Sequence, residues 1–141
     1  MSILDLEDRV LKKLWSTGFD SLSEPERVVA TIWGLEADVN NGGFHQYFFN
    51  SYGDLAFFAP AALRLIGAHH AAEIVERANQ LFGPEGPPRD RKPRQGMLLN
   101  ELRNRAEELL SSLDDEFYKY PENIGALLES YARKEIDFFN S

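Results

Sequence analysis

The sequence predicts an all-α protein, a single-domain irregular bundle of about six to eight helices. Apolar residues recur at spacings of three and four over most of the 141 residues, as they do along one face of a helix. Helix start and stop signals separate these stretches, and none of them shows the alternation of a half-buried strand. We expect helices over residues 3–16, 25–40, 43–50, 54–66, 69–82, 97–113 and 122–139.

The first two helices show clear signals. The first carries apolar residues at mixed spacings of three and four: Leu4, Leu6, Val10, Leu11, Leu14 and Trp15. Before the second, Ser23 and Glu26 form a capping box, and Pro25 suits a first helical turn. The apolar side of that second helix consists of Val28, Val29, Ile32, Leu35 and Val39.

Shorter helices are expected in the middle of the chain. A double glycine precedes residues 43–50, and Gly67 stops the helix over 54–66. Within the latter, Pro60 lies either in a first turn or at a kink. Residues 69–82 then place six apolar side chains on one face: Ala71, Ile74, Val75, Ala78, Leu81 and Phe82.

A loop is expected at residues 83–96, because GPEGPPRDRKPRQG contains four prolines and three glycines. This loop is also the only net-basic stretch, through Arg89, Arg91, Lys92 and Arg94. The helices expected on either side of this loop, over 69–82 and 97–113, need each other to bury their apolar faces. We therefore expect residues 1–141 to form one domain.

Composition narrows the classes of function. The chain carries 23 acidic and 15 basic residues, a net charge of −8, and it has no cysteine, which rules out disulfides and thiol chemistry. Its first residues lack the basic start of a signal peptide, and there is no apolar run of about 18 residues. We expect a cytoplasmic protein without a membrane segment, whose partner is itself basic.

The run NNGGFHQYFFN, residues 40–50, joins two of the expected helices. Glu36 lies on the apolar side of the preceding helix, where a carboxylate needs hydrogen bonds. We expect Gly42 to end that helix in the left-handed conformation and Asn41 to cap the next one. Glu36 then folds back onto the first N–H groups of the new helix. Three aromatic side chains of the run are expected to enter the core: Phe44, Tyr47 and Phe48.

A second interpretation uses the same residues as a site. Glu36, His45, Gln46 and Asn50 would line a pocket with an aromatic floor, and a buried glutamate beside a histidine would form an acid–base pair. No nucleophile arrangement, phosphate-binding loop or metal-ligand spacing accompanies them. We therefore expect no catalytic residue, no cofactor and no metal site.

A glycine turn between two helices also occurs in DNA-binding helix–turn–helix proteins. A recognition helix needs basic side chains that reach the phosphates, and residues 43–50 contain no Lys or Arg. We therefore expect no direct binding to nucleic acid.

The run from Glu36 to Asn50, E-x-x-x-N-N-G-G-F-x-Q-Y-F-x-N, resembles a bacterial family known largely as a domain of unknown function. Its best-known member is a DNA-mimic protein. The motif residues are Glu36, Asn40, Asn41, Gly42, Gly43, Phe44, Gln46, Tyr47, Phe48 and Asn50. The resemblance continues through Ala62-Leu63, Ile66-Gly67-Ala68 and LDDEFY at 113–118, and it spans roughly residues 25–140.

This resemblance implies an all-helical protein without catalysis, whose surface carboxylates imitate the phosphates of a duplex. Such a protein occupies the basic DNA-binding surface of a transcription regulator. Residues 96–141 contain ten acidic and five basic residues, so we expect the partner-binding acids there. The candidates are Glu107, Glu108, Asp114, Asp115, Glu116, Glu122, Glu129 and Asp137. Two alternatives stay open: an immunity-type protein that neutralises a basic toxin such as a nuclease, and a small-ligand binder that uses the Glu36–Asn50 region.

Overall fold

The computed structural model describes residues 2–137, and in this range it consists of helices without any strand. Seven α-helices and two short 3-10 helices follow one another along the chain. They are α1 (Ile3–Thr17), η1 (Phe19–Ser21), α2 (Glu24–Phe49), η2 (Ser51–Leu55), α3 (Ala59–Leu65), α4 (His69–Gln80), α5 (Arg91–Leu99), α6 (Glu107–Tyr118) and α7 (Ile124–Glu135). The prediction of a single-domain all-α bundle is confirmed.

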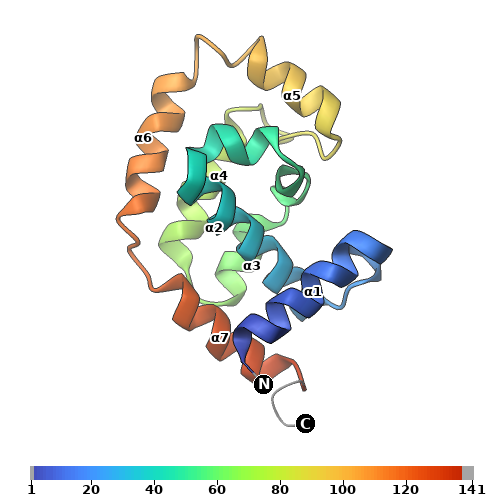
Figure 1. Ribbon diagram of the computed structural model, residues 1–141. Helices are drawn as coiled ribbons and strands as arrows, with labels where there is room; N and C mark the ends of the chain where they lie inside the picture. Colours follow the sequence, from blue (N-terminus) through green and yellow to red (C-terminus); the bar gives the residue numbers. More distant parts are fainter. Residues whose placement is uncertain (1, 138–141) are drawn as a thin grey trace.

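Helix α2 is the centre of the bundle (Figure 1). It contacts α1, α3, α5, α6 and α7, and most of its first half is buried. Its start follows the sequence signal: the Ser23 side chain accepts a hydrogen bond from the Glu26 N–H, and the Glu26 carboxylate accepts one from the Ser23 N–H. Both capping-box bonds satisfy N–H groups that no helical carbonyl reaches.

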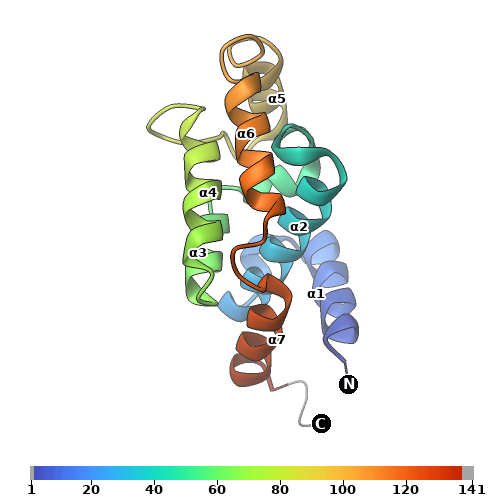
Figure 2. The same cartoon turned by 90° about the vertical axis from the view of Figure 1, so that its left-hand side faces the viewer.

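The remaining helices surround α2 on several sides. Helices α3 and α4 pack against each other on one side, and α1 lies on another (Figure 2). In both views α5 lies at one end of the molecule and α7 at the other, with α6 running between them (Figures 1 and 2). None of the helices between residues 2 and 137 is long and apolar enough to cross a membrane.

The aromatic residues of the NNGGF run enter the core, as expected. Phe44, Tyr47 and Phe48 are fully buried. The Phe44 ring lies 6.0 Å from that of Phe117 in α6, and the Phe48 ring lies 4.8 Å from that of Phe82. These edge-to-face contacts join α2 to the C-terminal half of the chain.

The expected loop at 83–96 is too long, because α5 begins at Arg91. Pro93 does not prevent this helix, since a proline in the first turn gives up an N–H that has no helical partner there. The helix expected over 97–113 is also wrong. Helix α5 ends at Leu99 and α6 begins at Glu107, so the chain changes direction between them (Figure 1). Leu98, Leu102 and Leu110 remain buried through this corner.

The helices expected over 25–40 and 43–50 are both present, as the two halves of α2 on either side of a kink at Gly42 and Gly43. Two other boundaries differ from expectation. The helix expected over 54–66 is divided into η2 and α3, and Pro60 lies in the first turn of α3 rather than at a kink. The last helix ends at Glu135, and Phe139 lies outside the described residues.

Candidate functional site

The double glycine makes a sharp kink inside α2. Gly43 has φ +77°, in the left-handed region, whereas Gly42 has a negative φ of −154°. The expectation that Gly42 would be the left-handed residue is therefore wrong by one position. A side chain at Gly43 would also collide with the Asp114 carboxylate, so this position needs glycine for two reasons.

The carboxylate at the start of the second half of α2 comes from Asp114, not from Glu36. Asp114 Oδ1 accepts a hydrogen bond from the Phe44 N–H at 2.8 Å. Burial raises the pKa of Asp114, and this hydrogen bond opposes the rise. The expected cap by Asn41 is also wrong, because Asn41 Nδ2 donates to Gln46 Oε1 at 3.0 Å. The acid that caps this helix is 70 residues away in the sequence, so the residues around the turn contain no signal that identifies it.

Glu36 binds the loop between α6 and α7. Its Oε2 accepts a hydrogen bond from the Tyr120 hydroxyl at 2.9 Å, and that hydroxyl accepts one from Asn40 Nδ2 at 2.7 Å. Burial raises the pKa of Glu36, and the Tyr120 bond opposes the rise. Burial also raises the pKa of Tyr120 to about 12. Glu36 and Asn40 thus hold α2 against the C-terminal segment.

Asp38 joins the two halves of α2, a role that the sequence analysis missed. Its buried Oδ1 accepts hydrogen bonds from Gln46 Nε2 at 3.0 Å and from Asn50 Nδ2 at 3.4 Å. Gln46 and Asn50 are four residues apart and share one face of the second half of α2, and the Asp38 carboxylate meets both of them across the kink. The sequence feature that indicates this role is an acidic residue eight positions before Gln46, within the same motif.

The expected Glu36–His45 acid–base pair does not form. The exposed His45 ring stacks on Phe49 with an interplanar angle of 10°, while Glu36 is bonded to Tyr120. Glu36 does line a cavity of about 360 Å³, together with Glu7, Trp33, Ala37 and Asn40. The residues His45, Gln46 and Asn50, which the pocket interpretation placed beside Glu36, do not line this cavity.

Arg94 is buried rather than solvated, although it was expected in a basic loop. Its guanidinium is fully enclosed and donates to four backbone carbonyls and to Asp54 Oδ1 at 2.8 Å. The carbonyls are those of Phe48, Asn50, Pro88 and Arg89, at 2.6 to 3.1 Å. The hydrogen bonds of this one side chain thereby hold three segments together: the end of α2, η2 and the loop before α5.

Five of the eight candidate partner-binding acids have interactions within the protein, namely Asp137 and the four whose contacts follow. Asp114 caps the second half of α2, and Glu122 accepts from the His70 and Ala71 N–H groups at the start of α4, at 2.6 and 3.0 Å. Glu116 forms two hydrogen bonds with Arg77, and Glu129 pairs with Arg133 at 3.0 Å. These contacts stabilise helix starts and helix pairs.

Three other candidates lie together on α6. Glu107, Glu108 and Asp115 are exposed, and no ion pair or side-chain hydrogen bond engages them within residues 2–137. Leu109 and Tyr118 are exposed on the same helix, at 53% and 46%. The remaining candidate, Asp137, is exposed at the end of the described chain. Helix α6 is therefore one element whose exposed acids an outside cation can bind without a competing internal partner.

A family profile described as DMP19-like protein matches residues 20–135. The chain belongs to the DMP19-like protein family. DMP19 is a DNA-mimic protein, so membership agrees with the resemblance seen in the sequence. No curated protein and no solved structure matches the chain. The matched segment includes the glycine turn, Arg94 and α6, whereas the whole of α1 precedes it.

In this DMP19-like chain the residues of the glycine-turn motif make contacts within the fold. Its aromatic residues are in the core, and its polar residues bond Asp38, Tyr120 and one another. The exposed acids lie outside the motif, whose own acids, Glu36 and Asp38, are partly or fully buried. Which of these acids are available to a partner depends on which have internal hydrogen bonds or ion pairs, and the local sequence does not indicate those internal contacts.

Proposed function

We propose that this protein is a non-enzymatic DNA mimic of the bacterial cytoplasm that binds the basic DNA-binding surface of a transcription regulator. Membership of the DMP19-like family is the observation that carries this proposal. The net charge of −8 supports it, because an acidic protein attracts a surface that evolved to bind phosphate.

The α6 surface, defined here as Glu107, Glu108 and Asp115, is the part of the molecule that we assign to this contact. Glu108 and Asp115 are seven residues apart in the sequence, two helical turns, so they lie on the same side of α6 at an axial spacing of roughly 10 Å. Both carboxylates are solvated before binding. A partner arginine can therefore bind them without first breaking an internal ion pair.

The proposal is tested by capture of the partner from a lysate of the native host. The purified protein is immobilised, exposed to lysate at low salt, and eluted first with duplex DNA and then with high salt. A DNA-binding regulator released by duplex DNA supports the proposal. Direct competition between the protein and operator DNA for that regulator then completes the test.

Other outcomes count against mimicry. A captured basic nuclease whose activity is inhibited would support the immunity-type function instead, since the same electrostatics serve both. If duplex DNA releases no basic protein, mimicry of DNA is contradicted. A variant that lacks the three α6 charges serves as the matched control for non-specific retention of basic proteins.

A further inference from the structure

Three carboxylates from three helices meet under the first half of α1. Glu7 of α1 and Glu36 of α2 line the same cavity of about 360 Å³, and both are half-buried. Glu129 of α7 is also half-buried, and it lies close enough to Glu7 to repel its charge, as Glu36 does. We call Glu7, Glu36 and Glu129 the acidic seam. The seam joins α1 to the two helices on which its first half lies.

Glu7 and Glu36 occupy positions where helix packing favours an apolar side chain. Glu7 lies three residues before the buried Val10, and Glu36 lies four residues after Ile32 and three before Val39, which are both buried. These spacings place each glutamate on the buried side of its helix. A carboxylate there loses hydration unless other groups compensate it. The contact between α1 and α2 therefore depends on whether these two groups are charged.

No basic side chain compensates this pair of acids. Between residues 2 and 137, neither Glu7 nor Glu36 forms an ion pair. Glu36 accepts a hydrogen bond from the Tyr120 hydroxyl at 2.9 Å, and Glu129 pairs with Arg133 at 3.0 Å. When Glu7 and Glu36 both ionise, two like charges therefore face each other across the contact between α1 and α2.

The sign of the pH dependence follows from the burial of the seam. Burial, together with repulsion from Glu36 and Glu129, raises the pKa of Glu7. Burial also raises the pKa of Glu36, against the opposing effect of the Tyr120 hydrogen bond. Docking of α1 is thus favoured fully below the ordinary glutamate pKa of about 4.3. That contribution is lost as pH rises through the raised pKa values of the docked state.

The remaining titratable groups around the first half of α1 do not act in this way. Asp5 accepts hydrogen bonds from the Ser2 N–H and hydroxyl, and these bonds lower its pKa. Asp8 is exposed and pairs with Lys12 at 3.0 Å. Burial raises the pKa of Tyr120 to about 12, so its hydroxyl stays protonated at neutral pH. Glu7 and Glu36 are therefore the groups whose ionisation weakens the docking of α1.

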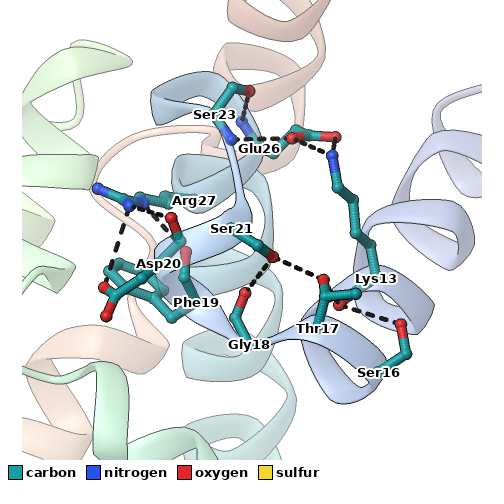
Figure 3. Close-up of polar contacts among 10 residues, drawn as sticks. All are labelled: Lys13, Ser16, Thr17, Gly18, Phe19, Asp20, Ser21, Ser23, Glu26 and Arg27. Atoms are coloured by element: carbon teal, nitrogen blue, oxygen red, sulfur yellow. Dashed lines mark hydrogen bonds and ion pairs between the residues drawn. The ribbon is translucent and has the colours of Figure 1, made fainter.

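The second half of α1 is anchored by contacts of a different kind (Figure 3). Lys13 Nζ donates to the Glu26 carboxylate at 3.1 Å, and hydrogen bonds with Ser23 and Lys13 lower the pKa of Glu26 although burial opposes them. This ion pair therefore persists from pH 5 upwards. The Trp15 ring makes an edge-to-face contact with Tyr52 at 5.3 Å. Helix α1 is thus held at its end, while like charges oppose its docking near its start.

We propose that the first half of α1, residues 3–10, is a pH-sensitive cover of the acidic seam. It packs on α2 and α7 most firmly when Glu7 and Glu36 are protonated, and it opens more often when both are ionised. The contacts of Lys13 and Trp15 hold the helix at its other end. This inference is independent of the proposed function, and α1 precedes the segment that the family profile matches.

Hydrogen–deuterium exchange of the full-length protein tests the cover. A single helix of 15 residues is marginally stable in water, so opened α1 exchanges its backbone N–H groups readily. Exchange is measured by mass spectrometry from about pH 4.5 to 7.5, with correction for the intrinsic pH dependence of the reaction. A peptide over residues 3–12 reports α1, and one over residues 70–80 in α4 reports the rest of the fold. We expect the protection of α1 relative to α4 to fall roughly threefold or more as pH rises. A constant or rising ratio overturns the inference.

A matched pair of variants assigns the effect to the seam. Glu7→Gln keeps the shape of the side chain and removes its charge, so it should abolish most of the fall and leave α1 better protected at neutral pH than in the unmodified protein. Asp8→Asn removes the same charge from the neighbouring, exposed position and should keep the fall. If Glu7→Gln retains the full fall, or if both variants behave alike, the inference is overturned.

Glu36→Gln tests the same repulsion from α2. The amide oxygen still accepts from Tyr120, so the contact with the loop after α6 is kept. We expect a smaller pH-dependent fall in the protection of α1, although the changed residue lies on another helix. Glu7→Gln/Glu36→Gln should differ from Glu7→Gln by less than Glu36→Gln differs from the unmodified protein, because the repulsion needs both charges. An α1 profile that Glu36→Gln leaves unchanged contradicts the inference.

Discussion

The Asp114 carboxylate accepts a hydrogen bond from the Phe44 N–H at 2.8 Å, across 70 residues of sequence. Phe44 is the first residue after the kink in α2, so its N–H has no helical acceptor. Asp114 belongs to α6, the helix that carries the exposed acids of the α6 surface. The same bond therefore completes the central helix and fixes the position of the proposed partner-binding helix.

Replacement of Asp114 by Ala is expected to destabilise the fold by about 1–2 kcal/mol, because the Phe44 N–H loses its acceptor at a half-buried helix start. Urea unfolding measures the change. Asp115→Ala is the matched control, since the neighbouring acid is exposed and has no internal hydrogen bond or ion pair within the described residues. Equal stability of the two variants would contradict a capping role for Asp114.

Gly43→Ala is expected to cost more stability than Gly42→Ala. An added side chain meets the Asp114 carboxylate at Gly43 and the Gln46 side chain at Gly42, but of these two glycines only Gly43 also has a left-handed φ. The expected cost at Gly43 is about 1–3 kcal/mol. Gly67→Ala separates the two causes, because Gly67 has φ +89° but an added side chain there meets no atom within 4 Å. If Gly43→Ala costs no more than Gly67→Ala, the contact with Asp114 is unimportant.

Arg94→Met is expected to destabilise the protein by about 3–5 kcal/mol, since Asp54 and four carbonyls lose their buried donor. Arg94→Lys keeps the charge but cannot reproduce the planar array of donors, so it should recover only part of the loss. Thermal and urea unfolding report both. Arg91→Met is the control, because exposed Arg91 reaches Asp54 only at 3.5 Å. An unchanged free energy of unfolding in Arg94→Met would contradict the role of Arg94 in holding these segments together.

Glu36→Gln is expected to change how stability depends on pH. Burial raises the pKa of Glu36, and burial together with repulsion from Glu36 and Glu129 raises the pKa of Glu7. Each group binds its proton more tightly in the folded state. The stability that each group contributes through this proton is therefore fully present below the ordinary glutamate pKa of about 4.3. It is lost as pH rises through the raised folded-state pKa.

The amide cannot ionise, and its oxygen still accepts from Tyr120. The stability of Glu36→Gln relative to the unmodified protein should therefore increase as pH rises from about 4.5 to 7. Urea unfolding at several pH values measures this difference, and Glu107→Gln, on the exposed side of α6, controls for the loss of one surface charge. A difference that decreases with pH would show that ionised Glu36 is favoured in the fold.

Removal of the three α6 charges by Glu107→Gln, Glu108→Gln and Asp115→Asn is expected to weaken binding to the captured regulator. The loss should be roughly two- to fivefold per charge at low salt, and the salt dependence of the affinity should become shallower. Calorimetric titration at several salt concentrations measures both. A control with the same change in net charge is Asp8→Asn/Glu24→Gln/Glu85→Gln. Equal losses in the two variants would assign the effect to net charge and not to the α6 surface.

The sequence by itself determined the elements whose signals are local. The capping box of Ser23 and Glu26 predicts the start of α2 to within a residue, because both partners lie within one helical turn. The spacing of Phe44, Tyr47 and Phe48 predicts their burial, because helical geometry alone places them on one face. Family membership also follows from the sequence, through the profile match over residues 20–135.

Only the tertiary structure decided what each charged residue does. Asp114 and Glu122 cap helices far away in the sequence, and Arg94 is buried although its neighbours in the sequence are exposed. A carboxylate on the surface of one helix has the same local sequence pattern whether it faces solvent or the N-terminus of another helix. The difference depends on groups within about 3 Å in space, and packing of distant segments sets those distances.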